Sequence, residues 1–151
     1  CIAVDPWFIV SAAPEETKLI STARRVNDAK PEWVLNKVRE TVADLSGEGV
    51  TRSDVTVACY GVTFKPDIDD VRESPAMKIV QALAAEGVRV IVVDPHVAQL
   101  PQLTKVSLVS FEEAEKTAQV ALILVGHKAF REKSRESWAG KTVIDACGLL
   151  A

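Results

Sequence analysis

The chain has 151 residues, of which 48% are hydrophobic and 26% are charged, and its formal net charge is −3. This ordinary globular balance excludes a disordered chain and allows one domain with a proper core plus some attached structure. The lysines and arginines form no basic cluster, which argues against a nucleic-acid partner. No apolar run approaches the roughly 18 residues of a membrane span, so we expect no membrane partner either.

The three cysteines are Cys1, Cys59 and Cys147, and no two of them form a CxxC pair. Their odd number and their spacing argue against a disulfide framework and against a zinc site, and we predict no bound metal. Such cysteine usage is typical of a reducing compartment, so we expect a cytoplasmic protein. Because the chain begins at a cysteine and not at a methionine, we also expect it to be a piece of something longer.

The first third of the chain is expected to be extended at its start and helical afterwards. Residues 1–13 are apolar, and Pro6 argues against a helix through that point. Apolar residues then follow helical spacing over residues 14–46, Pro31 must begin, kink or restart a helix there, and Gly47 stops the pattern. We predict a helical connector with a face for a partner, and the alternative is a helix that packs only on its own domain.

Strand and helix patterns alternate in the rest of the chain. The expected strands are residues 55–60, 88–93, 106–109, 120–125 and 143–145. The expected helices are residues 75–85, 110–117 and 128–138. Repeated strand–helix units predict an α/β fold with a doubly wound, Rossmann-like parallel sheet, preceded by the helical connector. In such a sheet a ligand lies beyond the carboxyl ends of the strands.

The loop after the first strand has the most distinctive sequence, GVTFKPDIDDVRESPA, over residues 61–76. It lacks the second and third glycines of the GxGxxG dinucleotide motif. It presents Lys65 and Arg72 just before a helix that begins at Ser74, and two cations beside a helix N-terminus favour a phosphate. The alternative is a solvated loop whose acidic residues pair with its basic ones.

Other polar residues give weaker signals. Cys1 with Asp5 four residues later fits a thiol nucleophile and an assisting acid, although a cysteine in an apolar stretch is more often a small buried residue. His96 and His127 each follow a strand end, but a histidine alone is more often a surface or capping residue. Asp94 ends a strand where a ribose-binding acid lies in dinucleotide domains, yet without the glycine motif a cofactor role is not favoured.

Four segments in this order carry a resemblance to a known family. They are CIAVDPWF, RRVND followed by Pro31, FKPDIDDVRESPA, and VIVVDP. Together they resemble the UDP-glucose/GDP-mannose dehydrogenases, the UDP-sugar 6-dehydrogenases, from residue 1 to about residue 148. The opening residues look closest to the UDP-N-acetyl-D-mannosamine branch, and the UDP-glucose branch is the nearest alternative.

The resemblance implies a domain organisation. Members of this family consist of two Rossmann-like domains, the first binding NAD and the second binding UDP, joined by a long helix that forms a homodimer. Residues 1–13 would then end a missing N-terminal domain, residues 14–50 would be the connector, and residues 51–151 would be the UDP-sugar-binding domain. A homodimer through residues 14–46 is expected.

The resemblance also implies a reaction, in which the sugar C6 alcohol is oxidised to a carboxylate in two steps. Cys1 matches the cysteine that captures the aldehyde and becomes a thioester, and Asp5 matches the acid that assists it. Phe64 and Lys65 match a substrate-contacting pair, and Arg72 matches an arginine that reaches the NAD. The product would serve surface polysaccharide synthesis.

The chain departs from the family pattern in two ways. The chain has no NAD domain, so we expect no dehydrogenase activity from it alone. Cys147 occupies a position where relatives commonly carry a lysine or arginine close to the substrate. A different class of function stays open, namely a nucleotide-binding or dimerisation module with no catalytic role.

Overall fold

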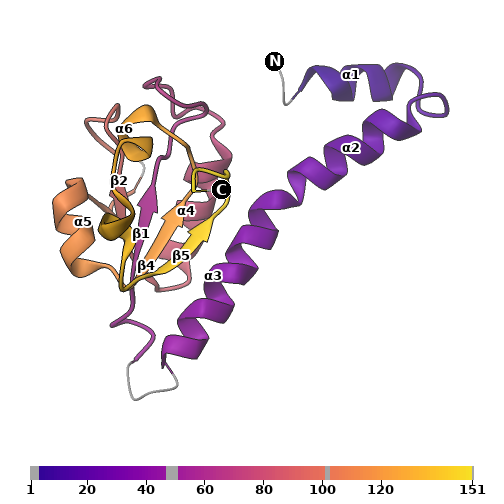
Figure 1. Ribbon diagram of the computed structural model, residues 1–151. Coiled ribbons are helices and arrows are strands. Elements are labelled where there is room, and N and C mark those ends of the chain that lie inside the picture. The colour runs from indigo at the N-terminus through magenta and orange to yellow at the C-terminus, as the bar shows by residue number, and fades with distance from the viewer. Residues whose placement is uncertain (1–3, 47–50, 101–102, 151) are drawn as a thin grey trace.

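A computed structural model describes residues 4–46, 51–100 and 103–150. It contains a helical arm followed by an α/β domain, and the arm runs along one side of the domain (Figure 1). Among the helices of these residues, none is both long and apolar enough to cross a membrane.

The arm consists of three helices, α1 (Asp5–Ala12), α2 (Lys18–Asp28) and α3 (Lys30–Ser46). The predicted helical stretch is confirmed from Lys18 onward, whereas residues 14–17 form the turn before α2. Pro31 lies in the first turn of α3, where its missing N–H is not needed. The helix therefore restarts at this proline.

The prediction of an extended segment before the arm is wrong over Asp5–Ala12, because these residues form α1. Pro6 lies in the first turn of this helix, where its fixed φ suits the helix and no intrahelical N–H donor is lost. The proline therefore marks the beginning of a helix and does not prevent one.

The helix α3 packs on the α/β domain, whereas α1 and α2 contain no buried residue. Val34, Val38 and Val42 of α3 are at most 1% exposed and belong to the domain core. Nε of Arg39 also lies 3.1 Å from Oε2 of Glu86, just after α4. The alternative that this region packs on its own domain thus holds for α3, while α1 and α2 extend beyond it (Figure 1).

The domain has a parallel sheet of five strands in the order β3-β2-β1-β4-β5. The strands are β1 (Thr56–Tyr60), β2 (Arg89–Val93), β3 (Ser107–Leu108), β4 (Val120–Ile123) and β5 (Thr142–Asp145). The helices between them are α4 (Pro75–Ala85), α5 (Phe111–Thr117), α6 (Lys128–Arg131) and the 3₁₀ helix η1 (Arg135–Trp138). Because the chain starts at the central strand and winds outward in both directions, the predicted doubly wound sheet is confirmed.

The two faces of the sheet carry two separate cores. Val57 and Cys59 of β1 point into the core beneath α3 and α4, and the alternate residue Tyr60 points into the other. On that second face Tyr60 packs against Phe111 and Trp138, with ring centroids 5.4 and 4.9 Å away. The single helix predicted over residues 128–138 is in fact split into α6 and η1, because the backbone at Ser134 is extended.

Gly61 fixes where the chain leaves β1. Its φ is +83°, and a Cβ at this position would lie 2.6 Å from Cβ of Val125. Only a glycine has both the required backbone conformation and the required small size here. The loop that follows therefore leaves the sheet close against the end of β4.

Candidate nucleotide-binding site

The loops that follow β1, β2 and β4 meet at the carboxyl edge of the sheet, where a doubly wound fold binds its ligand. The β1–α4 loop is closed on itself, because the N–H of Phe64 donates to the carbonyl oxygen of Asp70 over 2.7 Å. At its C-terminal end Ser74 caps α4, and its hydroxyl oxygen accepts from the N–H of Met77 at 3.3 Å. The predicted helix start at Ser74 is thereby confirmed.

Lys65 and Arg72, the two cations predicted for a phosphate clamp, have different surroundings. Lys65 is exposed, its Nζ lies 5.9 Å from the centroid of the Phe64 ring, and no carboxylate of the described residues forms an ion pair with it. Arg72 donates from Nε and Nη2 to the two oxygens of Asp70 at 2.9 and 2.8 Å. Hydrogen bonds from the Arg72 side chain and backbone lower the pKa of Asp70 to about 2. The alternative of internal pairing thus holds for Arg72, and Lys65 remains available for a ligand.

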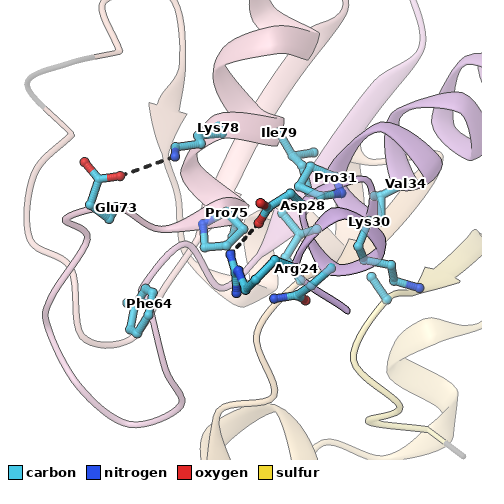
Figure 2. Close-up of a pocket in the computed structure, with 14 residues that line it drawn as sticks. Arg24, Asp28, Lys30, Pro31, Val34, Phe64, Glu73, Pro75, Lys78 and Ile79 are labelled. Carbon is cyan, nitrogen blue, oxygen red and sulfur yellow. Dashed lines mark hydrogen bonds and ion pairs between the residues drawn. The ribbon is translucent and has the colours of Figure 1, made fainter. Parts of the chain in front are cut away.

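A cavity of about 450 Å³ lies between the α2–α3 junction and the start of α4. This volume is in the range of small-molecule sites, about 300–1,000 Å³. Figure 2 shows Phe64 on one side of it and the Arg24–Asp28 pair on the other. A second ion pair, Lys78 with Glu73 at 3.3 Å, lies at the rim. Phe64 lines the cavity, whereas Lys65 and Arg72 do not.

The charged and polar residues that line this cavity were not predicted as site residues from the sequence. The side chain of Arg24 is only 13% exposed, and its Nε is buried without a hydrogen-bond partner among the described residues. Asn27 and Lys78 line the same cavity. The segment RRVND ahead of Pro31 could have indicated these cavity residues, because it places an arginine and an asparagine one turn apart on the helix.

Of the proposed catalytic pair, the structure describes Asp5 alone. Cys1 is outside the described residues. Asp5 is exposed at the first turn of α1, which Figure 1 shows at the free end of the arm, away from the sheet. Within the described residues Asp5 is therefore not brought together with Phe64 and Lys65.

Asp94 and His127 form a buried pair that the sequence did not predict. His127 is completely buried, and its side chain makes no capping hydrogen bond, so the expectation of a surface or capping histidine is wrong. Oδ2 of Asp94 lies 3.2 Å from Nε2 of His127 and accepts from the N–H of Val62 at 2.8 Å. Burial acts to raise the pKa of Asp94, but hydrogen bonds from His127, Val62 and the His96 N–H outweigh it and lower this pKa.

Asp67, His96 and His127 are the described residues arranged closely enough to hold a metal ion, with one ligand atom from each lying within 4.8 Å of the others. Oδ1 of Asp67 is 3.5 Å from Nε2 of His96 and 3.7 Å from Nδ1 of His127. However, Nδ1 of His127 already accepts from the N–H of Asp67 at 2.9 Å. A metal ion at this nitrogen would have to displace that backbone N–H.

The turn after β5 is organised by Asp145. Its carboxylate accepts from the N–H groups of Cys147, Gly148 and Leu150 at 3.1, 2.8 and 2.8 Å. Burial and the charge of Asp145 together raise the pKa of the Cys147 thiol to about 11. Cys147 thus contributes a neutral thiol to the turn after β5.

We expect Cys147 to be alkylated slowly although it is exposed. Raising a thiol pKa from 9.0 to about 11 leaves about 100-fold less thiolate at neutral pH, and the thiolate is the reactive form. Iodoacetamide labelling at pH 7.5, followed by peptide mass spectrometry, measures the rate against an unfolded control. The rate should keep rising with pH up to about 11, and a rate equal to that of the unfolded control would contradict the raised pKa.

Comparison with known proteins agrees with this geometry. Residues 58–151 match the model of the UDP-glucose/GDP-mannose dehydrogenase family, UDP binding domain. A parallel doubly wound domain with a ligand loop at its carboxyl edge is the expected architecture of such a domain, and the chain belongs to this family.

The particular relatives are sugar-nucleotide dehydrogenases. The chain is 44% identical to the UDP-N-acetyl-D-mannosamine dehydrogenase of Escherichia coli (strain K12), over 99% of this chain and 36% of that protein. It is also 44% identical to the NDP-N-acetyl-D-galactosaminuronic acid dehydrogenase of Ralstonia nicotianae, over 99% of this chain and 34% of that protein. The chain therefore spans about a third of the length of these curated relatives.

Solved structures show the same likeness. The UDP-N-acetyl-mannosamine dehydrogenase of Staphylococcus aureus superposes with a TM-score of 0.76 at 33% identity, covering 99% of this chain and 34% of that one. The UDP-D-ManNAc dehydrogenase of Pyrococcus horikoshii superposes with a TM-score of 0.80 at 26% identity, covering 100% of this chain and 35% of that one. The family resemblance seen in the sequence is confirmed.

Proposed function

We propose that the chain is the UDP-sugar-binding portion of an NAD-dependent UDP-N-acetyl-D-mannosamine 6-dehydrogenase of the cytoplasm, working in surface polysaccharide synthesis. The observation that carries the proposal is Lys65 beside Phe64, with no ion-pair partner among the described residues, at the carboxyl edge of a domain that matches a UDP-binding family model. A lysine in this position can neutralise a phosphate, and an aromatic ring offers a flat apolar surface to a base or a sugar.

The proposed reaction oxidises the sugar C6 alcohol to a carboxylate. NAD, held mainly by a domain outside this chain, would supply the oxidant for each of the two oxidations. The Cys1 thiolate adds to the intermediate aldehyde, the thiohemiacetal is oxidised to a thioester, and water releases the carboxylate with Asp5 assisting. The planar guanidinium of Arg72 suits a pyrophosphate and would have to exchange its Asp70 partner for the cofactor.

A second sugar is favoured by one comparison. The relative from Ralstonia nicotianae has the same 44% identity and is named an NDP-N-acetyl-D-galactosaminuronic acid dehydrogenase. An N-acetylgalactosamine nucleotide is thus the second candidate substrate. UDP-glucose remains an alternative within the family, and a non-catalytic nucleotide-binding or dimerisation module remains the alternative outside it.

We also propose that two copies of the chain associate through residues 14–46. The arm exposes large apolar side chains on helices with no buried residue, such as Leu19, which is 83% exposed, and Val26, which is 69% exposed. Apolar surface of this kind on a projecting element is typical of an interface. Analytical ultracentrifugation at high micromolar concentration should show a dimer, and a strict monomer at that concentration would contradict it.

Titration calorimetry with UDP tests the nucleotide site. The 151-residue chain should bind UDP or a UDP-sugar weakly and should produce no NADH when NAD is added, because it contains no glycine-rich dinucleotide motif. A folded chain, checked by circular dichroism, that binds no UDP would rule out the proposed function. Assays of the full-length protein with NAD and a panel of UDP-sugars then identify the sugar.

A further inference from the structure

The middle of the β1–α4 loop is held by a buried residue from the segment that follows β4. Between Phe64 and Asp70 the loop has no regular secondary structure. The N–H of Asp67 donates to Nδ1 of His127 over 2.9 Å, and His127 is completely buried in the segment after β4. The histidine thus links the β1–α4 loop to the core of the sheet.

The hydrogen bonds define which ring nitrogen of His127 carries the proton. A backbone N–H is always a donor, so Nδ1 must accept from Asp67 and carries no proton. The proton is then on Nε2, which donates to Oδ2 of Asp94 at 3.2 Å and lies 3.4 Å from the hydroxyl oxygen of Thr63. Thr63 itself donates to the carbonyl oxygen of Lys65 at 2.8 Å, so its oxygen is free to accept from Nε2. The arrangement requires a neutral imidazole.

The loop backbone also has an uncommon conformation at Asp67. Asp67 has a φ of +60°, in the left-handed region that residues with a side chain seldom adopt. Its N–H is held by His127, and its Oδ1 accepts from the N–H of Lys128 at 2.9 Å. Both contacts come from the segment after β4, so this segment holds the loop in this conformation.

We propose that His127 is a positioning residue: as a neutral imidazole protonated on Nε2, it fixes the loop that presents Phe64 and Lys65 to the nucleotide. The proposal rests on the proposed function, since it takes the nucleotide to bind beside these two residues. Phe64 lies three residues before Asp67 and closes the loop through Asp70. Releasing Asp67 therefore lets Phe64 and Lys65 move together.

Two substitutions of similar size separate positioning from general stability. His127→Asn keeps an acceptor near the place of Nδ1 but loses the donor to Asp94, whereas His127→Gln keeps a donor towards Asp94 but loses the acceptor for Asp67. By calorimetry, His127→Asn should bind UDP within about threefold of the wild type, and His127→Gln about 10-fold more weakly. Equal UDP affinities of the two variants would overturn the proposal. If His127 had only a structural role, the two substitutions would have the same effect on UDP binding.

A double-mutant cycle with Lys65→Ala checks that His127 acts through the loop. The combined effect of Lys65→Ala and His127→Gln should be smaller than the product of the separate effects, because both act on the same contact. If the two substitutions lower UDP affinity independently of each other, the positioning role of His127 is contradicted. UDP affinity that rises on addition of Zn²⁺ and falls with EDTA would instead assign Asp67, His96 and His127 to a metal ion and overturn the proposal.

Hydrogen exchange gives a measurement that needs no ligand. The amide of Asp67 should exchange at least about 10-fold faster in His127→Gln than in His127→Asn, because only the former leaves it without an acceptor. Equal exchange rates would overturn the positioning role even if UDP binds normally. If the wild type binds no UDP but the exchange rates differ as expected, then the proposed function fails and the loop-positioning role of His127 stands.

Discussion

Replacing Cys1 by serine in the full-length protein is expected to lower steady-state turnover by about 100- to 1,000-fold while leaving substrate binding nearly unchanged. A serine hydroxyl can add to an aldehyde, but its hemiacetal and ester intermediates turn over far more slowly than those of a thiolate. The thiol contributes little to holding the UDP, so the effect should appear in kcat and not in the dissociation constant.

A buried structural cysteine would give the opposite result. The variant would lose on the order of 1–3 kcal/mol of stability through an unsatisfied hydroxyl, with near-normal turnover in the folded fraction. Cys59 supplies the matched control, because it is completely buried in β1 and burial raises its pKa to about 12. Cys59→Ser should lower the thermal midpoint and leave turnover per folded molecule intact. Turnover of Cys1→Ser within a few-fold of the wild type would rule out the nucleophile role.

Replacing Lys65 by alanine is expected to weaken UDP binding about 10- to 150-fold, which corresponds to the roughly 1.5–3 kcal/mol of a hydrogen bond to a charged group. The side chain is exposed and forms no ion pair with a described carboxylate, so its removal should leave no buried charge unpaired and should cost little stability. Calorimetry of UDP binding and the thermal midpoint, measured on the same preparation, separate the two effects.

Lys105 is a suitable control for this experiment. It is also an exposed lysine, but it precedes β3 and so lies towards the amino ends of the strands, away from the proposed site. Lys105→Ala removes the same charge and should leave UDP affinity within about twofold, since exposed charges at such distances are screened by salt. An unchanged affinity of Lys65→Ala would remove Lys65 from the site, and equal losses in both variants would point to nonspecific electrostatics.

Local sequence patterns predicted the elements of this protein because each pattern is a property of neighbouring residues. β-rich and continuous apolar runs predicted the strands, and helical spacing predicted the connector helices. A serine followed by a proline predicted the helix start at Ser74. The long FKPDIDDVRESPA segment indicated the family. The error at Pro6 is also local, because a proline permits the first turn of a helix as readily as it interrupts the interior of one.

Only the tertiary structure decided which polar groups meet. Asp67, Asp94 and His127 are tens of residues apart in the chain, and the strand order β2-β1-β4 brings the loops that carry them to one edge. Likewise, Arg24 from α2 reaches the start of α4 because α3 packs on that helix. A spacing rule cannot express contacts between distant segments, since they depend on how the strands are ordered and how the helices cover them. The sequence by itself thus determined the fold and the family. The packing determined that Arg72 is paired, that Lys65 has no ion-pair partner among the described residues, and that His127 is buried.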